Sequence, residues 1–541
     1  MKAEFTTEAQ RHRGQRVFRI QSLLETAHQF LFSCLSQTLS SLCLCASVVI
    51  LLLPPPAAQA QPDPPPRALQ LQTEAFAAMD KGNYPKAEQL LREQLALDRG
   101  NFVIYYNLAC VRNLQDDGPG AAKLLIDAIE HGFIDLYQLK RDPQLNLARE
   151  QQEIKTLLSN WPEVLKRQVD ANIKSARELF TDKPKPYAQT RDENMRLAYL
   201  SAMDPGSTAQ AQADIARLYK WGIANVFPDL ADEEKAKRDS WCVVILPTPK
   251  DFLRWATLNF GAAAVNQTLG TGIGGAYTHD TKRLVAQDLG ATLRHEFFHV
   301  LHWRDNVRHG QEHAIWVQEG LCSLVEDYEI VGDGDDARLK PVPSWRTNIA
   351  KRLNQGGHLM TIKQIASIPR EKFTGDRPLA NYGQARTIFL YLYEKGKLKD
   401  WYAAYTKGFR EDRTGVKAFE VAFGKPIADI EKEYKAWVRG LPMVAEQIKP
   451  GEASLGVDVD PGNGDGPVIA DIPKDGRGPK NPSRLAGLKV GDVITAIDNK
   501  PTRDLNELVR LLGEKEVGEE VEVSYRRGTK HETTKVKLVR R

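Results

Sequence analysis

The sequence TLRHEFFHVL, residues 292–301, decides the fold of the central part of this 541-residue chain. Apolar residues surround the polar ones on all sides, so the stretch predicts a buried helix. His295 and His299 are four residues apart, which places one imidazole a turn above the other, about 6 Å along the helix axis. Glu296 lies beside them and is placed to contact a water molecule rather than the ion. The stretch therefore predicts a metal-binding helix.

A third ligand is required, because hydrolytic zinc sites use three protein ligands and a water molecule. Glu319, in WVQEGL at residues 316–321, follows His299 by twenty residues, enough for a loop and a returning helix. The alternative third ligand is Asp305, as in the zinc-binding pattern His-Glu-x-x-His-x-x-Gly-x-x-Asp. In that pattern the glycine lets the chain turn back to the metal, but His302 occupies its position here. We therefore expect Glu319 to be the third ligand and keep Asp305 as the alternative. Weaker candidates in the same region are His302, His309 and His313.

Together these two motifs resemble the gluzincin metallopeptidases, particularly the peptidase-MA-like group. The resemblance implies a Zn²⁺ ion held by His295, His299 and Glu319. It also implies that the ion lowers the pKa of a water molecule to about 7 and that Glu296 accepts the water's proton during attack on a peptide bond. In this family a downstream tyrosine or histidine donates to the oxyanion, for which we expect Tyr382 first and His313 second. A packing role is the alternative for Tyr382.

Substrate alignment and ligand support have their own candidates. Zincins pair an extended peptide with a strand edge before the metal helix, and Gly275, Ala276 and Tyr277 resemble that element. The alternative is a glycine-rich hairpin that binds no ligand. The outer ring N–H groups of the two histidines need acceptors, and the candidates, which the sequence does not rank, are Ser323, Glu326 and Asp288.

The composition predicts several packed domains. With 42% hydrophobic and 27% charged residues, the chain differs from disordered and multi-span membrane proteins. The formal charge of +4 is small for this length and favours no nucleic-acid partner. The apolar run 42–53 follows several arginines and precedes Ala58-Gln59-Ala60, which indicates a signal peptide cleaved near Ala60, with an uncleaved anchor as the alternative. We expect an exported protein, periplasmic or extracellular.

The C-terminal segment combines SLGV at residues 454–457 with AGLKVGDVITAID at residues 486–498. This combination resembles the PDZ domains of bacterial HtrA-type proteases. The resemblance implies that Leu455, Gly456 and Val457 bind the carboxylate end of an extended peptide and that the helix at 504–512 forms the other wall of the groove.

We therefore expect a multidomain α+β protein with an α-helical repeat segment, a zincin-like catalytic domain of mixed sheet and metal-binding helices, and a small β-rich PDZ domain. The repeat segment resembles tetratricopeptide units, for which a short helical cap is favoured over a peptide groove. The expected boundaries are 1–60 signal peptide, 61–68 proline-rich linker, 69–160 tetratricopeptide-like repeats, 161–240 helical connector, 241–447 zincin-like domain and 448–541 PDZ domain. The expected function is an exported zinc-dependent peptidase whose repeat and PDZ modules bind substrates or partners. The alternative is a zincin-fold scaffold without activity.

Overall fold

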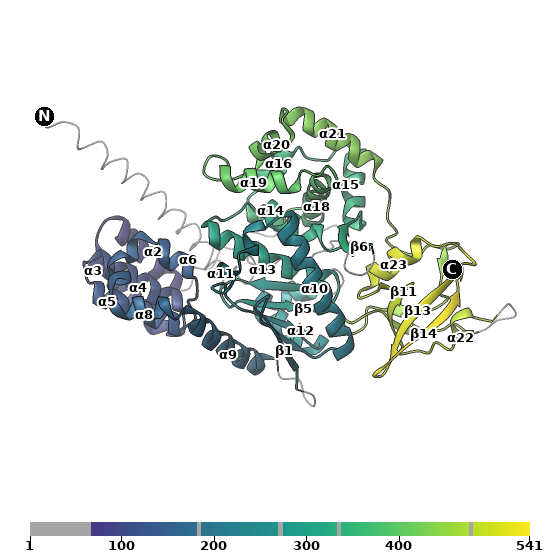
Figure 1. Cartoon of the computed structure of the whole chain (residues 1–541), viewed down its shortest axis with the longest axis horizontal. Helices are drawn as coiled ribbons and strands as arrows, with labels where there is room; N and C mark the ends of the chain where they lie inside the picture. The colour runs from purple at the N-terminus through teal and green to yellow at the C-terminus, as the bar shows by residue number, and fades with distance from the viewer. Residues whose placement is uncertain (1–66, 181–185, 269–273, 333–336, 475–479) are drawn as a thin grey trace, which may run out of the picture. The chain divides into compact units, whose positions relative to one another are not determined.

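The computed structural model describes residues 67–180, 186–268, 274–332, 337–474 and 480–541, with the side chains of 261–268 left aside (Figure 1). The expected signal peptide lies outside the described residues, as does most of the expected proline-rich linker. The chain divides into two compact units, which separate between Ala171 and Asn172. Each unit is described by itself. Among the described helices, none combines the length and apolarity needed to cross a bilayer.

The first unit is helical. Its first four helices are α2 (Arg67–Asp80), α3 (Tyr84–Leu97), α4 (Phe102–Leu114) and α5 (Gly118–Glu130). The starts of α3 and α5 are 118 − 84 = 34 residues apart, which is the expected repeat length. Buried alanines at 75, 87, 121 and 128 let the helices approach closely. The remaining elements are α6 (Leu136–Arg141), η1 (Pro143–Leu145), α7 (Asn146–Glu150), α8 (Gln152–Ser159) and α9 (Trp161–Leu179), which continues into the second unit.

The second unit begins with a five-stranded sheet in the order β1-β2-β3-β5-β4. The strands are β1 (Ala188–Asp192), β2 (Leu197–Ser201), β3 (Cys242–Leu246), β4 (Gly275–Thr278) and β5 (Arg283–Ala286). β2, β3 and β5 are parallel, and the outer strands β1 and β4 are antiparallel to their neighbours. The segment 161–240, expected as a helical connector, also contains β1 and β2, which belong to this sheet.

Helices cover this sheet and complete the domain that runs from β1 to α21, hereafter the central domain. Those between the strands are α10 (Pro205–Asn225), η2 (Pro228–Ala231), α11 (Glu233–Ala236) and α12 (Pro249–Thr268). The HEFFH stretch falls within α13 (Ala291–His309), and Glu319 lies in α14 (Ile315–Leu324). A hairpin of β6 (Tyr328–Val331) and β7 (Arg338–Pro341) follows. Seven helices then complete the domain: α15 (Trp345–Gln355), α16 (Ile362–Ala366), α17 (Arg370–Gly375), α18 (Pro378–Glu394), α19 (Leu398–Gly408), α20 (Val416–Phe423) and α21 (Ile427–Gly440).

The core of the central domain fixes the pair α13 and α14. Phe297 and Phe298 of α13 are buried, and Phe298 packs against Trp221 and Phe227. Gly320 lies where α14 crosses α18, since a Cβ atom there would meet the Phe389 ring at 2.5 Å. The glycine after Glu319 therefore permits the close helix contact that holds Glu319 in place.

The C-terminal domain is β-rich. Its sheet has the order β14-β13-β11-β10-β9, and β12 pairs with β11. The strands are β8 (Ala453–Ser454), β9 (Asp458–Asp460), β10 (Val468–Asp471), β11 (Val493–Ile497), β12 (Lys500–Pro501), β13 (Glu520–Arg527), β14 (Lys530–Lys537) and β15 (Val539–Arg540). The helices are α22 (Pro482–Leu485) and α23 (Leu505–Gly513). Much of the expected insertion at 474–482 lies outside the described residues.

Candidate metal centre

The start of α13 is set by Asp288. Its carboxylate accepts the backbone N–H groups of Gly290 (2.9 Å) and Thr292 (3.1 Å), so it caps the helix. The helix ends at Gly310, whose φ of 65° is the left-handed conformation that glycine adopts readily at this position. Asp288, one of the three candidates for a histidine acceptor, is thus used as a helix cap.

Three side chains converge at the centre of the central domain: His295 and His299 from α13, and Glu319 from α14. The Nε2 atoms of the two histidines are 3.2 Å apart. Glu319 Oε2 lies 3.4 Å from Nε2 of His295 and 3.6 Å from Nε2 of His299. Ligands at about 2.05 Å from a tetrahedral zinc ion are about 3.3 Å from one another. The three observed separations fit that triangle, so the donor set and its spacing suit a zinc ion.

A cysteine lies near the same place. Cys322 follows Glu319 by one turn of α14, and its sulfur forms a group with donor atoms of His295 and His299 that all lie within 4.8 Å of one another. Cys322 is buried and forms no disulfide with another described residue. The Glu319 oxygen is within 3.6 Å of both imidazole nitrogens, close to the tetrahedral spacing, so its position suits a third ligand.

Charge reinforces that assignment. Burial alone would raise the pKa of the Glu319 carboxyl, but the neighbouring imidazoles of His299 and His295 lower it well below its ordinary value. Glu319 is therefore ionised. A carboxylate and two imidazoles are ligands that zinc accepts.

Glu296 lies next to this triangle. Its Oε2 atom accepts the backbone N–H of Tyr277 at 2.8 Å. Its Oε1 atom is buried and has no hydrogen-bond partner among the described residues. Burial raises the pKa of the Glu296 carboxyl to about 8, and the negative charge of Glu319 adds to this effect while His295 opposes it. A bound cation reverses much of this shift, since its charge favours the carboxylate. One oxygen is thus fixed by the sheet and the other is available to a water molecule.

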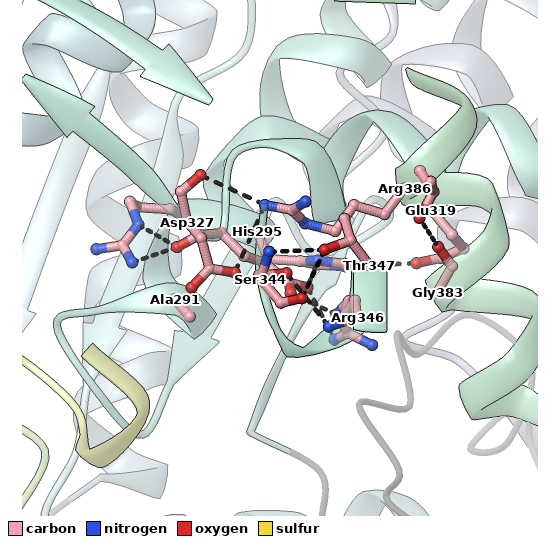
Figure 2. Close-up of polar contacts among 12 residues, drawn as sticks. Ala291, His295, Glu319, Asp327, Ser344, Arg346, Thr347, Gly383 and Arg386 are labelled. Atoms are coloured by element: carbon pink, nitrogen blue, oxygen red, sulfur yellow. Dashed lines mark hydrogen bonds and ion pairs between the residues drawn. The ribbon is translucent and has the colours of Figure 1, made fainter. Parts of the chain in front are cut away.

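Glu326 holds His295 from behind. Its Oε1 atom lies 2.8 Å from His295 Nδ1, which we assign as the protonated nitrogen. The lone pair of His295 Nε2 is then directed toward the other two candidate ligand atoms, His299 Nε2 and Glu319 Oε2. Arg346 of α15 binds the same carboxylate through Nε at 2.5 Å and a terminal nitrogen at 2.9 Å. Figure 2 shows Arg346 and His295 in this polar cluster. Burial opposes ionisation of Glu326, yet the charge of Arg346 and the bond with His295 lower its pKa to about 2.

The structure thus selects Glu326 among the three candidate acceptors. The third candidate, Ser323, is buried, and its hydroxyl has no hydrogen-bond partner among the described residues. Sequence reasoning missed Arg346 because no local pattern marks it. The only sequence signal for Arg346 is its position directly after Trp345, where a helix starts.

The rival ligands lie elsewhere in the core. Asp305 accepts the Tyr402 hydroxyl at 2.6 Å and pairs with His309 at 3.4 Å. His313 uses Nδ1 toward His302 (2.8 Å) and Nε2 toward Gln311 (3.0 Å). Both ring nitrogens of His313 are engaged, which disfavours it as an oxyanion donor.

Tyr382 lies buried in α18. Its ring centroid is 5.6 Å from the Arg346 guanidinium and 5.4 Å from the Phe373 ring. Tyr382 therefore packs on the arginine that holds Glu326, and its role as an oxyanion donor stays a prediction.

The predicted substrate strand is an edge strand. Among the strands that the structure describes, β4 pairs only with β5, with Gly275 opposite Ala286 and Tyr277 opposite Leu284. Since the Tyr277 N–H donates to Glu296 and the Gly274 carbonyl accepts from Gln287, Gly275 and Tyr277 face the outer edge while Ala276 faces β5. Gly275 is required at this place, because a Cβ atom would meet the Val285 carbonyl oxygen at 2.4 Å.

The two predicted walls of the peptide groove in the C-terminal domain correspond to β9 and α23. β9 is the last strand of its sheet, and half-buried Val457, Val459 and Val509 pack on the domain core. Leu455 is buried in that core, so its contribution to a groove is its backbone. Gly456 has a φ of 72°, and its N–H donates to the Ser454 hydroxyl at 3.0 Å. The Ser454 hydroxyl thus accepts the Gly456 N–H that was expected to bind the carboxylate of a peptide.

Residues 453–538 match the PDZ domain family. The C-terminal segment is a PDZ domain. Among solved structures, the chain is similar to the HtrA-type protease AlgW with decapeptide (21% identity over 21% of this chain and 35% of that one, TM-score 0.15). It is also similar to the serine endoprotease from Yersinia pestis (20% identity over 21% and 36%, TM-score 0.14). A third is the aminopeptidase N family protein from Idiomarina loihiensis (13% identity over 65% and 67%, TM-score 0.25). No curated protein matches the chain.

The chain thus spans about a third of the length of each of these two proteases. TM-scores this low carry no argument about the activity of the central domain. The interpretation of that domain therefore depends on the geometry of its own residues.

Proposed function

We propose that the protein is a zinc-dependent peptidase. The observation that supports this most is the triangle of donor atoms from His295, His299 and Glu319, with edges of 3.2, 3.4 and 3.6 Å. Glu296 lies beside it with one oxygen held by Tyr277 and the other available. Residues that merely pack a core do not need two imidazoles and an ionised carboxylate at this spacing.

A bound zinc ion would supply Lewis acidity, making a coordinated water molecule acidic and polarising the substrate carbonyl. Glu296 would accept a proton from the attacking water at Oε1, because Oε2 is already held by Tyr277. Glu296 would then pass that proton to the leaving amine. Glu326 would keep the His295 ring in the orientation that presents Nε2 to the ion. The side chains of His295, Glu296, His299 and Glu319 are all buried. Their burial excludes bulk water and strengthens the electrostatic interactions among them.

The edge of β4 would align the substrate. Gly275 and the Tyr277 carbonyl face outward while the Tyr277 N–H is held by Glu296, so an extended peptide could pair with Gly275 next to Glu296. Peptide bonds match such an edge better than esters or phosphates do, because each strand residue offers both a donor and an acceptor. This pairing supports a peptide rather than a small ester as the substrate.

The PDZ domain would bind extended peptides along β9, the free edge of its sheet. We further propose that the helical unit recruits a partner or caps the chain, and that the protein is exported after cleavage near Ala60. Cell fractionation with N-terminal sequencing tests the export. An unprocessed N-terminus in the cytoplasm would contradict it.

The function is tested with purified protein and the variant Glu296→Gln. We expect both proteins to contain about one zinc ion per chain by elemental analysis, because Glu296 is not a ligand. Only the unsubstituted protein should cleave an unfolded protein substrate such as casein. Glu371→Gln, at an exposed position of α17, is the matched control and should keep full activity. Equal cleavage by Glu296→Gln would overturn the mechanism, and absence of cleavage from every zinc-loaded form would favour the alternative of a scaffold.

A further inference from the structure

The PDZ domain is fixed to the start of the metal-binding helix. Asp504, at the N-terminus of α23, accepts the backbone N–H of Ala291 at 3.1 Å. The Leu289 N–H donates to the Gly464 carbonyl at 2.8 Å. Gly464 is needed here, because a Cβ atom would meet the Gln287 carbonyl oxygen. A carboxylate of one domain therefore helps to cap a helix of the other.

Charged side chains continue this contact along one face of α23. Arg503 binds Asp214 of α10, Glu507 binds Arg294 of α13 at 2.7 Å, and Arg510 lies 3.8 Å from Glu329 of β6. Glu507 and Arg510 are three positions apart and share one face of α23, and Arg503 directly precedes the helix cap. All three are buried, as are Asp214 and Arg294. Charges are buried in this way only when each has a partner, so the two domains depend on one another at this face.

Arg294 leads from this face to the metal site. It is only 1% exposed and directly precedes His295. Its Nε and one terminal nitrogen bind the backbone carbonyl of Glu326, and that same terminal nitrogen carries the ion pair with Glu507. The side chain of Glu326 in turn binds His295 Nδ1. Four residues thus form an unbroken polar series from α23 of the PDZ domain to a candidate metal ligand.

We propose that Glu507 is a positioning residue of the metal site and that the PDZ domain is therefore part of that site. Glu507 fixes the Arg294 guanidinium, Arg294 fixes the Glu326 backbone, and Glu326 fixes the His295 ring. This inference rests on the proposed zinc site. The inference goes beyond the proposed function, because a PDZ domain that only delivers substrates would have no effect on metal affinity.

The test compares Glu507→Gln with Glu514→Gln in the full chain. Both changes remove one negative charge from the same segment, but Glu514 is 45% exposed and pairs with Arg510 rather than with the central domain. Zinc affinity is measured by competition with a chromogenic chelator. Direct acceptors of metal-bound histidines alter affinity by about 10–100-fold, so we expect a more remote residue to weaken zinc binding by about 3–10-fold. Cobalt-loaded Glu507→Gln should also show a shifted visible absorption band, which loss of general stability does not produce.

Zinc should also act in the opposite direction, because coupling between two sites is reciprocal. Hydrogen exchange of the unsubstituted protein should show slower exchange in α23 with zinc than without it. This measurement decides the matter if Glu507→Gln fails to fold. Unchanged affinity and cobalt spectrum in a folded Glu507→Gln protein, or unchanged exchange in α23, would overturn the inference while leaving the zinc site intact. No zinc binding by the unsubstituted protein would instead refute the proposed function itself.

Discussion

Replacing Glu326 with glutamine perturbs the support of His295 while leaving all three candidate ligands in place. The glutamate carboxylate binds His295 Nδ1 through one oxygen and Arg346 through both. Glutamine has nearly the same volume but only one acceptor atom and no charge. Its one oxygen can take the place of Oε1, which accepts from both His295 and Arg346, but its NH₂ group would then face the Arg346 Nε–H. Turning the amide to relieve that repulsion leaves His295 without an acceptor.

The magnitude follows from these contacts. Loss of the acceptor of a metal-bound histidine weakens metal affinity by about 10–100-fold, which corresponds to about 1.4–2.8 kcal/mol. Arg346 would keep its charge in a site where it is only 2% exposed. Breaking a buried ion pair by removing one partner costs about 3–5 kcal/mol, and the remaining amide oxygen offsets part of that cost. We expect the free energy of unfolding to fall by about 2–3 kcal/mol.

Zinc affinity is measured by chelator competition, and stability by urea unfolding of the zinc-free protein. Glu411→Gln, an exposed position outside the site, is the control and should behave like the unsubstituted protein. Zinc binding by Glu326→Gln within a factor of two of that control would refute the reasoning, because His295 would then not depend on Glu326 for its orientation.

Three further predictions follow from the same contacts. Gly320→Ala places a Cβ atom 2.5 Å from the Phe389 ring, so the free energy of unfolding in urea should fall by about 1–3 kcal/mol; an unchanged value would show that α14 can move away from α18. Burial and the negative charges of Glu507 and Asp288 raise the pKa of Asp504 to about 7, although the positive charge of Arg294 opposes this rise. The contribution of Asp504 to the stability of the folded protein is therefore present at low pH and is lost as pH rises from about 4 to 7. Melting temperatures across that range should fall less with pH in Asp504→Asn, and parallel curves would contradict this. Tyr382→Phe should lower kcat by about 100-fold at unchanged zinc content if the hydroxyl binds the oxyanion. Unchanged steady-state kinetics would instead assign Tyr382 to packing.

The sequence predicts the helix that carries His295 and His299 and the returning helix that carries Glu319, because their signal is local. The spacing of His295 and His299 fixes their common face, and the glycine after Glu319 marks a close helix contact that the structure places against Phe389. The edge position of β4 agrees with the resemblance to zincins, in which the strand before the metal helix has an exposed edge.

Non-local features were not predictable in the same way. β1 and β2 are short, and only their pairing with β3 makes them part of the sheet. Arg294 and Glu507 are 213 residues apart in the chain, and no periodic pattern links them. Even a residue close to the motif can be ambiguous in sequence. A carboxylate at Asp288 could cap the following helix or accept from a histidine, and only its contacts with Gly290 and Thr292 decide for the cap.

Zinc K-edge X-ray absorption of the purified protein tests the proposed site most directly. We expect about one zinc ion per chain, with three protein ligands that are all nitrogen or oxygen, and loss of the ion in the triple alanine variant at His295, His299 and Glu319. A sulfur ligand would mean that Cys322 takes the place assigned to Glu319. Absence of zinc from protein purified without chelators and then supplied with the ion would contradict the metal site altogether.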